Sequence, residues 1–147
     1  MHTRGSRAQI LVMVLLIMSA LMAAGLMLTR AVVSEGYMAD LYLNRAKAFC
    51  LAEAGIEEAK VIIMNNPNWF TDNPHNPDGE LFWVIHFSSG YVKKLGKDSY
   101  KIVRENGKNI IYSVGFTGEK MNKAKARSVI SIKFDINTFK YYEFKIL

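Results

Sequence analysis

The most prominent pattern along the chain is a run of apolar residues close to its start. Residues 8–29 are 22 consecutive positions without a charge and without a proline, and most of them are Leu, Ile, Val, Met or Ala. A bilayer core about 30 Å thick requires about 20 apolar residues in a helix that rises about 1.5 Å per residue. The run therefore predicts one transmembrane helix over about residues 8–29.

A second pattern follows over residues 30–64, where apolar residues recur at spacings of three and four. This spacing places them on one side of an amphipathic helix. That side consists of Met38, Leu41, Tyr42, Ala48, Phe49, Ala52, Ile56, Ala59 and Ile63. Asp40, Lys47 and Glu58 are predicted to lie opposite, whereas Arg45 falls in the middle of the apolar side.

The remaining chain predicts a loop and then strands. The Asn-Asn-Pro sequence at residues 65–67 should end the helix, and the loop over residues 65–80 holds all three prolines. Aromatic and β-branched residues then predict strands at 81–87, 100–105, 108–114 and 127–136, with an edge strand or a tail at 139–147. Asn106-Gly107 is a strong hairpin signal, because both turn positions need positive φ. We expect an α+β fold in which the amphipathic helix packs on a small antiparallel sheet of three to five strands.

Flanking charges indicate how the apolar run is oriented. Arg4 and Arg7 precede the run and Arg30 follows it, which favours an amino terminus in the cytoplasm and a body outside. An ordinary secretory signal is the alternative, since residues 19–25 hold small residues suited to cleavage. Such a cleavage would release a soluble protein that starts near residue 25.

The first residues carry a feature of a different kind. A short start, Met-His-Thr-Arg-Gly, ends in Gly5 directly before Ser6, and the apolar run begins two residues later. This start resembles the leader of type IV prepilins, in which a prepilin peptidase cuts after a Gly on the cytoplasmic side of the membrane. The resemblance implies cleavage between Gly5 and Ser6, methylation of Ser6, and a mature chain that keeps its membrane anchor.

One position differs from the major subunits of that family. They carry a Glu at the fifth mature position, where this chain has Ile10 preceded by the polar Gln9. In the family, that Glu is thought to pair with the terminal amine of a neighbouring subunit. Because it lacks this Glu, the chain resembles the minor subunits that lie at or near the filament tip.

A segment within the amphipathic helix carries the most specific resemblance. Arg45-Ala46-Lys47-Ala48-Phe49-Cys50-Leu51-Ala52-Glu53-Ala54-Gly55-Ile56-Glu57 is similar to a stretch of PilX-type minor pilins and of K-type minor pseudopilins of type II secretion. Leader, anchor and this stretch occur in the family's order and cover about residues 4–60. K-type pseudopilins carry an extra domain for which this chain has no room, so the resemblance favours the PilX type.

The resemblance implies a domain plan and a function. It divides the chain into a leader at 1–5, a long helix at 6–64 and a loop-plus-sheet domain at 65–147, which is a pilin-like plan. It implies a structural subunit that primes or caps a type IV pilus or a type II secretion pseudopilus. The implied partners are other pilins or pseudopilins, a prepilin peptidase and an assembly platform in the inner membrane.

Charge is uneven along the chain and allows a second function. Residues 91–147 hold 13 Lys or Arg and five Asp or Glu. Lys120, Lys123, Lys125 and Arg127 form a cluster that could bind DNA phosphates, an acidic neighbouring subunit or lipid headgroups. A filament-tip binding module for DNA or adhesion is therefore one alternative, and a plain single-pass membrane protein is another.

No motif for catalysis or for a cofactor stands out. His2, His75 and His86 lack the spacing of a metal site or a triad, and His86 is expected in a hydrogen-bonded structural role within a strand. Calcium is disfavoured around Asp72, Asn76, Asp78 and Glu80, because the EF-hand pattern would require acids where Pro74 and Ile85 stand. Cys50 is alone and is expected to be a small buried residue. We expect neither an enzyme nor a bound metal or cofactor.

Overall fold

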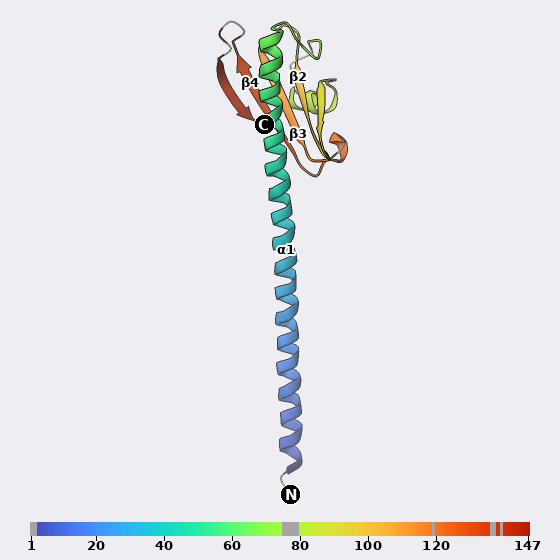
Figure 1. Ribbon diagram of the computed structural model, residues 1–147. Helices are drawn as coiled ribbons and strands as arrows, with labels where there is room; N and C mark the ends of the chain where they lie inside the picture. The colour runs from blue at the N-terminus through green and yellow to red at the C-terminus, as the bar shows by residue number, and fades with distance from the viewer. Residues whose placement is uncertain (1–2, 75–79, 119, 136–137, 139) are drawn as a thin grey trace. The chain divides into compact units, whose positions relative to one another are not determined.

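The computed structural model describes residues 3–74, 80–118, 120–135, 138 and 140–147 (Figure 1). The elements are α1 (Thr3–Asn65), α2 (Glu80–His86), β1 (Tyr91–Leu95), β2 (Asp98–Arg104), β3 (Ile110–Phe116), the short 3-10 helix η1 (Met121–Lys123), β4 (Arg127–Phe134) and β5 (Tyr141–Ile146). The chain divides into two compact units, Met1–Asp40 and Leu41–Leu147. We call them the first and the second unit. Of the residues discussed above, His2, His75, Asn76 and Asp78 lie outside the described part.

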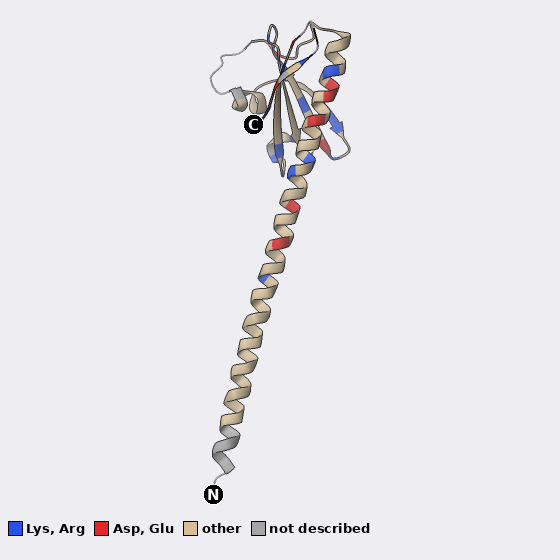
Figure 2. Ribbon diagram, turned by 90° about the vertical axis from the view of Figure 1, so that its left-hand side faces the viewer, with Lys and Arg blue, Asp and Glu red and all other residues tan. Residues whose placement is uncertain are grey.

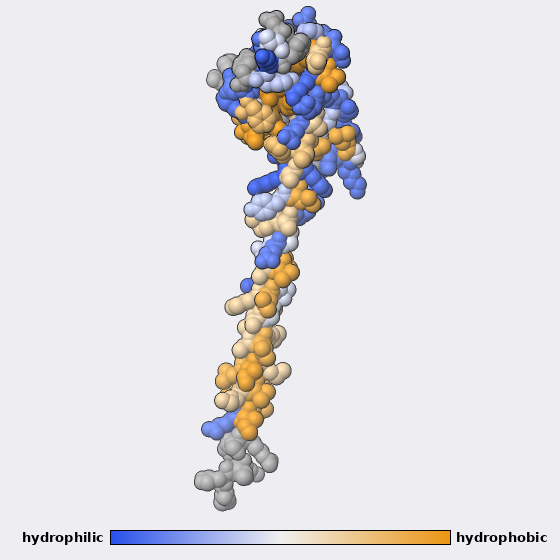
Figure 3. All heavy atoms as spheres, turned by 60° about the vertical axis from the view of Figure 1, so that its left-hand side comes forward, coloured by the Kyte–Doolittle hydropathy of each residue, from blue (hydrophilic) through white to orange (hydrophobic). Residues whose placement is uncertain are grey.

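The first unit consists of the apolar part of α1. All described side chains from Gln9 to Asp40 are exposed, and orange spheres mark the apolar ones among them (Figure 3). From Gln9 on, α1 is long and apolar enough to cross a membrane. The transmembrane prediction and the long helix therefore agree with the structure, and α1 ends at Asn65, where the Asn-Asn-Pro sequence begins.

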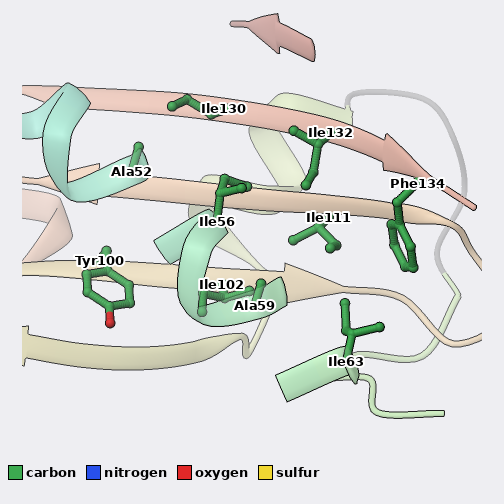
Figure 4. Packing of buried hydrophobic residues seen from close by; sticks show 10 residues of the cluster. All are labelled: Ala52, Ile56, Ala59, Ile63, Tyr100, Ile102, Ile111, Ile130, Ile132 and Phe134. Carbon is green, nitrogen blue, oxygen red and sulfur yellow. The ribbon is translucent and has the colours of Figure 1, made fainter. Parts of the chain in front are cut away.

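The second unit is built on a five-stranded antiparallel sheet with the order β1-β2-β3-β4-β5. From Leu41 on, α1 lies across one face of this sheet (Figure 1). Four residues of the predicted apolar side, Ala52, Ile56, Ala59 and Ile63, are at most 5 % exposed there. They meet Tyr100, Ile102, Ile111, Ile130, Ile132 and Phe134 of the sheet (Figure 4). The predicted α+β architecture is confirmed.

Glycine makes the contact between α1 and β3 close. A Cβ atom on Gly115 would lie 2.0 Å from the carbonyl oxygen of Ala48 and 2.4 Å from the nitrogen of Ala52. A Cβ atom on Gly55 would lie 2.2 Å from the hydroxyl oxygen of Ser113. These distances are too short for real contacts, so Gly115 allows the strand to meet the helix backbone, and Gly55 leaves room for the side chains of Ser113 and Tyr100.

The predicted strand at 81–87 is wrong, because this segment is the helix α2. Val84 is fully buried against Val103, Tyr112, Val114 and Val129, which belong to the sheet face opposite α1. Phe82 on the same helix is 61 % exposed. Aromatic and β-branched residues favour strands only weakly, and packing on a neighbouring surface can override that preference. Tyr91–Leu95, which was not predicted, provides the strand β1 in its place.

The other strand predictions are confirmed. β2 and β3 pair as an antiparallel hairpin around Asn106-Gly107, and Gly107 has a φ of 76°. β4 alternates as expected, since Ile130 and Ile132 pack under α1 while Val129 packs on the α2 side. Residues 141–146 form the edge strand β5 rather than a tail.

Candidate functional site

The predicted processing site lies at the start of α1. Gly5 and Ser6 both belong to the helical backbone. The side chains of Gln9 and Ile10 are exposed, with 62 % of Ile10 accessible. An exposed apolar side chain at this position suits lipid or a second helix. These four residues are neighbours along one helix, and their roles in processing and assembly stay predictions.

Packing explains much of the segment at residues 45–57. Ala48, Ala52 and Gly55 are buried against the sheet, whereas Glu53 and Glu57 are exposed. Small residues repeat on one side of α1 because only they permit the short distance to β3. Arg45, which the sequence placed in the middle of the apolar side, is exposed. The acidic and basic residues of the segment therefore face outward and are free of any role in the core.

The position of Glu58 on α1 differs from the prediction. The sequence placed it opposite the apolar residues, but only 20 % of its side chain is exposed, and its carboxylate accepts a hydrogen bond from the hydroxyl of Tyr100. Lys93 of β1 donates to the same carboxylate at 2.8 Å. This hydrogen bond, followed by the charge of Glu58, raises the pKa of Lys93. Glu58 therefore ties α1 to the β1–β2 side of the sheet.

An apolar groove of about 430 Å³ runs between α1 and β5. It is lined by Glu53, Ile56, Glu57, Lys60, Ile132, Tyr141 and Phe144. The ammonium group of Lys60 lies 4.6 Å from the centre of the Tyr141 ring and pairs with Glu57. Partial burial, and then the charge of Glu57, raises the pKa of the Tyr141 hydroxyl. The groove offers a mixed apolar and acidic surface beside an open strand edge.

A second groove, of about 470 Å³, lies on the other side of α1. It is lined by Ala46, Lys47, Cys50, Leu51, Ala54, Leu95 and Asp98. Cys50 is exposed here, so the expectation of a buried cysteine is wrong. Its position on α1 points away from the small residues that contact β3, which explains the exposure.

β5 carries an ion cluster at the edge of the sheet. The carboxylate of Glu143 pairs with Lys133 of β4 and with Lys145 of its own strand. The hydrogen bond from Lys133, and then that from Lys145, lowers the pKa of Glu143 to about 2. Charged side chains on an edge strand also discourage pairing with a foreign strand.

Lys101 was not singled out from the sequence, yet it is a buried cation that holds α2. Its ammonium group donates to the carbonyl oxygens of Val84, at 3.1 Å, and of Ser88. Burial lowers its pKa, and the charge of Asp72 partly offsets this effect. The Asp72 carboxylate in turn accepts hydrogen bonds from the backbone N–H groups of Ser89, at 2.6 Å, and Gly90, at 3.0 Å. Asp72 thus has a structural role.

Arg104 is a second buried cation that sequence reasoning missed. It is 4 % exposed, and its guanidinium donates to the carbonyl oxygens of Pro67, at 2.8 Å, and Trp69, at 2.6 Å. Burial lowers its pKa. Arg104 therefore fixes the chain that leaves α1. The sequence does contain a signal for these two buried cations. Lys101 and Arg104 both interrupt an apolar strand, and a charge buried there is costly unless it has hydrogen-bond partners.

The predicted basic cluster is exposed. Lys120 and Lys123 lie at η1, Lys125 follows, and Arg127 begins β4. All four side chains are accessible to solvent. The structure therefore brings these four residues together on the connection between β3 and β4, where their charges are available to a partner.

The remaining candidates for chemistry are the histidines and the acidic residues of the described part of the chain. Among the described residues, no group of three or more His, Cys, Asp or Glu could hold a metal ion. His86 lies exposed at the end of α2, and its ring centre is 4.6 Å from that of Phe82. The expected place of His86 within a strand is therefore wrong.

Comparison with protein-family models, with curated proteins and with solved structures finds no match for this chain.

Proposed function

We propose that this chain is a minor subunit of a filament of the type IV pilus or type II secretion kind. In this proposal, a prepilin peptidase removes residues 1–5, and α1 anchors the chain in the inner membrane with its start in the cytoplasm. The second unit then lies outside. An assembly platform moves the subunit into a filament together with other pilins or pseudopilins, at a priming or tip position.

The observation that carries the proposal is the apolar surface of α1 beyond the predicted span. A single-pass anchor needs only about 20 apolar residues. On α1, large apolar side chains stay exposed past residue 29, among them Val33 at 68 %, Tyr37 at 66 % and Tyr42 at 63 %. Exposed apolar surface of this kind favours contact with other helices. It supports a filament subunit over a plain single-pass protein.

Ile10 supports a minor role. The major subunits that this chain resembles need a Glu at the corresponding position to pair with a neighbour, and the exposed Ile10 cannot form such a pair. A tip subunit has no neighbour above it to satisfy. The exposed basic cluster keeps a tip-bound DNA or adhesion module as the alternative. Loss of DNA binding when Lys120, Lys123, Lys125 and Arg127 are replaced would support that module, and no binding at low salt would rule it out.

The decisive experiment is the intact mass and amino-terminal sequence of the membrane-bound protein, expressed with and without a prepilin peptidase. We expect loss of residues 1–5 and methylation of Ser6 only when the peptidase is present. Gly5→Leu should abolish this processing, because the peptidase reads the Gly before the cut. Ala24→Leu is the matched control and should leave it intact.

Two other results would contradict the proposal. Cleavage near residue 25 that Ala24→Leu blocks would identify an ordinary secreted protein. A chain that stays uncut with an active peptidase would be a single-pass membrane protein, provided that a known prepilin in the same cells is processed.

A further inference from the structure

A small pocket lies between the chain that leaves α1 and the turn that joins β2 to β3. Its volume is about 240 Å³, and it is lined by residues 68–70, residues 104–107 and Asn109. Asp72 forms an isolated bridge with Glu105, which holds the two segments side by side. Pockets for drug-sized ligands measure about 300–1,000 Å³, so this pocket suits a ligand of a single ring. We call it the hairpin pocket.

The hairpin pocket contains a buried cation whose hydrogen bonds are incomplete. Arg104 is 4 % exposed, and its Nη1 atom donates to the carbonyl oxygens of Pro67 and Trp69. Its Nε atom donates to the carbonyl oxygen of Lys108 at 3.5 Å. The two N–H groups on Nη2 have no acceptor in the described part of the chain. A guanidinium has five N–H donors and a buried donor without an acceptor is costly, so Nη2 favours a ligand that carries oxygen acceptors.

A carboxylate and three amides add acceptors and further donors to the hairpin pocket. Glu105 is 1 % exposed and pairs with Lys108 at 2.9 Å, so the pocket holds charges of both signs. Figure 2 likewise shows both blue and red residues near the end of α1. Asn68, Asn106 and Asn109 are exposed, and each side-chain amide can donate and accept. Hydroxyl groups on a neutral ligand match all of these groups, whereas an anion would approach the carboxylate of Glu105.

Two aromatic side chains complete the hairpin pocket. Trp69 is half-buried and packs on the core cluster under α1, whereas Phe70 is 45 % exposed. The face of an aromatic ring carries partial negative charge, which attracts the C–H groups on the flat side of a sugar ring. A pyranose presents such C–H groups on one side and hydroxyl groups around its edge. It therefore requires both kinds of surface that this pocket offers.

We propose that the hairpin pocket binds one pyranose unit of a carbohydrate. Sugar oxygens accept hydrogen bonds from Nη2 of Arg104, and sugar hydroxyl groups donate to Glu105 and to the amides. Trp69 and Phe70 cover the C–H side of the ring. The site belongs to the second unit alone and goes beyond the proposed filament role, so neither depends on the other.

The test uses the full chain in micelles of a phosphocholine detergent, because a sugar-based detergent would itself compete for the pocket. Methyl α-glucoside, methyl β-galactoside, methyl α-mannoside and N-acetylglucosamine are the probes. NMR follows the indole N–H of Trp69 and the side-chain amides of Asn106 and Asn109. We expect at least one probe to shift these signals saturably and to leave the indole N–H of Trp83 on α2 unchanged. A dissociation constant in the millimolar range is expected for a ligand of about 12 non-hydrogen atoms.

A matched pair of double variants ties this binding to the hairpin pocket. Phe70→Ala with Asn109→Ala removes an aromatic face and an amide, and it should weaken binding about tenfold. Phe87→Ala with Asn65→Ala replaces the same residue types at exposed positions outside the pocket and should leave binding unchanged. Phe70→Leu keeps an apolar side chain but loses the aromatic face, and it should weaken binding by itself. The backbone amide spectrum of the sheet checks that each variant is folded.

Three outcomes would overturn the inference. They are the absence of a saturable shift with all four sugars, an equal weakening in both double variants, and unchanged binding in Phe70→Leu. Sodium acetate that shifts the pocket signals when the sugars do not would identify an anion site instead. Sugar binding by a chain that a prepilin peptidase leaves uncut would support this inference and contradict only the proposed function.

Discussion

Gly115 and Gly55 set the distance between α1 and β3, and no larger residue fits at either position. The close approach leaves the small side chains of Ala48, Ala52 and Ala59 fully buried. It also explains why this stretch of α1 is rich in Ala and Gly. At this scale, the small residues serve packing.

Gly115→Ala should destabilise the second unit by about 1–3 kcal/mol, because the new methyl group forces α1 away from β3. Unfolding followed by the fluorescence of Trp69 and Trp83 measures the loss. Gly36→Ala is the control: nothing lies within 4 Å of its position, and Ala favours a helix more than Gly does. An unchanged stability of Gly115→Ala would mean that α1 is not in contact with β3.

Glu143 should titrate far below an ordinary glutamate. Its pKa of about 2 reflects Lys133 first and Lys145 second. A lowered pKa stabilises the fold above the ordinary value of about 4.3, and the contribution disappears as the pH falls through about 2. In a carboxyl NMR titration, Lys133→Gln should raise the pKa of Glu143, whereas Lys140→Gln should not. A wild-type pKa near 4.3 would rule out the ion cluster.

At the scale of elements, α2 shows how a short helix is held by a distant side chain. Seven residues form too short a helix to be stable alone. Val84 anchors it on the sheet, and Lys101 donates to the Val84 carbonyl oxygen in its last turn, where a cation is favourable. Asp72 fixes the turn that follows.

Lys101→Met should therefore loosen α2 while leaving the sheet paired. The Met side chain keeps most of the apolar stem but removes the Lys101 donor to the buried carbonyl oxygen of Ser88, which costs about 1–3 kcal/mol, whereas the carbonyl oxygen of Val84 still accepts from the Ser88 hydroxyl at 2.7 Å. Hydrogen exchange should speed up at the amides of Phe87 and Ser88 and stay slow in β3. The exposed Lys94→Met is the control. Equal exchange in both variants would show that Lys101 does not hold α2.

At the scale of the whole molecule, the two units differ in where their apolar side chains lie. The first exposes apolar side chains in every direction, and the second buries its apolar residues on both faces of one sheet. The first unit includes a helix that is long and apolar enough to cross a membrane. The processing experiment proposed above tests whether it does so with its start removed.

Several features could be predicted from the sequence because they depend on local periodicity. The apolar run, the amphipathic repeat of α1 and the Asn106-Gly107 hairpin each follow from spacing within a few residues. The alternation in β4 and the end of α1 at Asn65 belong to the same class. Such signals survive because a helix or strand must present one side to the core wherever it packs.

Tertiary structure alone decided the rest, because those features join residues far apart in the chain. The segment at 81–87 has residues typical of a strand, yet it forms the helix α2. As a helix, it packs Val84 on the sheet face that holds Val103 and Tyr112. Lys101 and Arg104 became buried because carbonyl groups of distant loops surround them. Residues 94–97 and 120–127 likewise come close together only because their strands belong to one sheet and the Gly118 N–H donates to Asp98. Local sequence cannot encode which distant surface will be present, and that surface determined each of these outcomes.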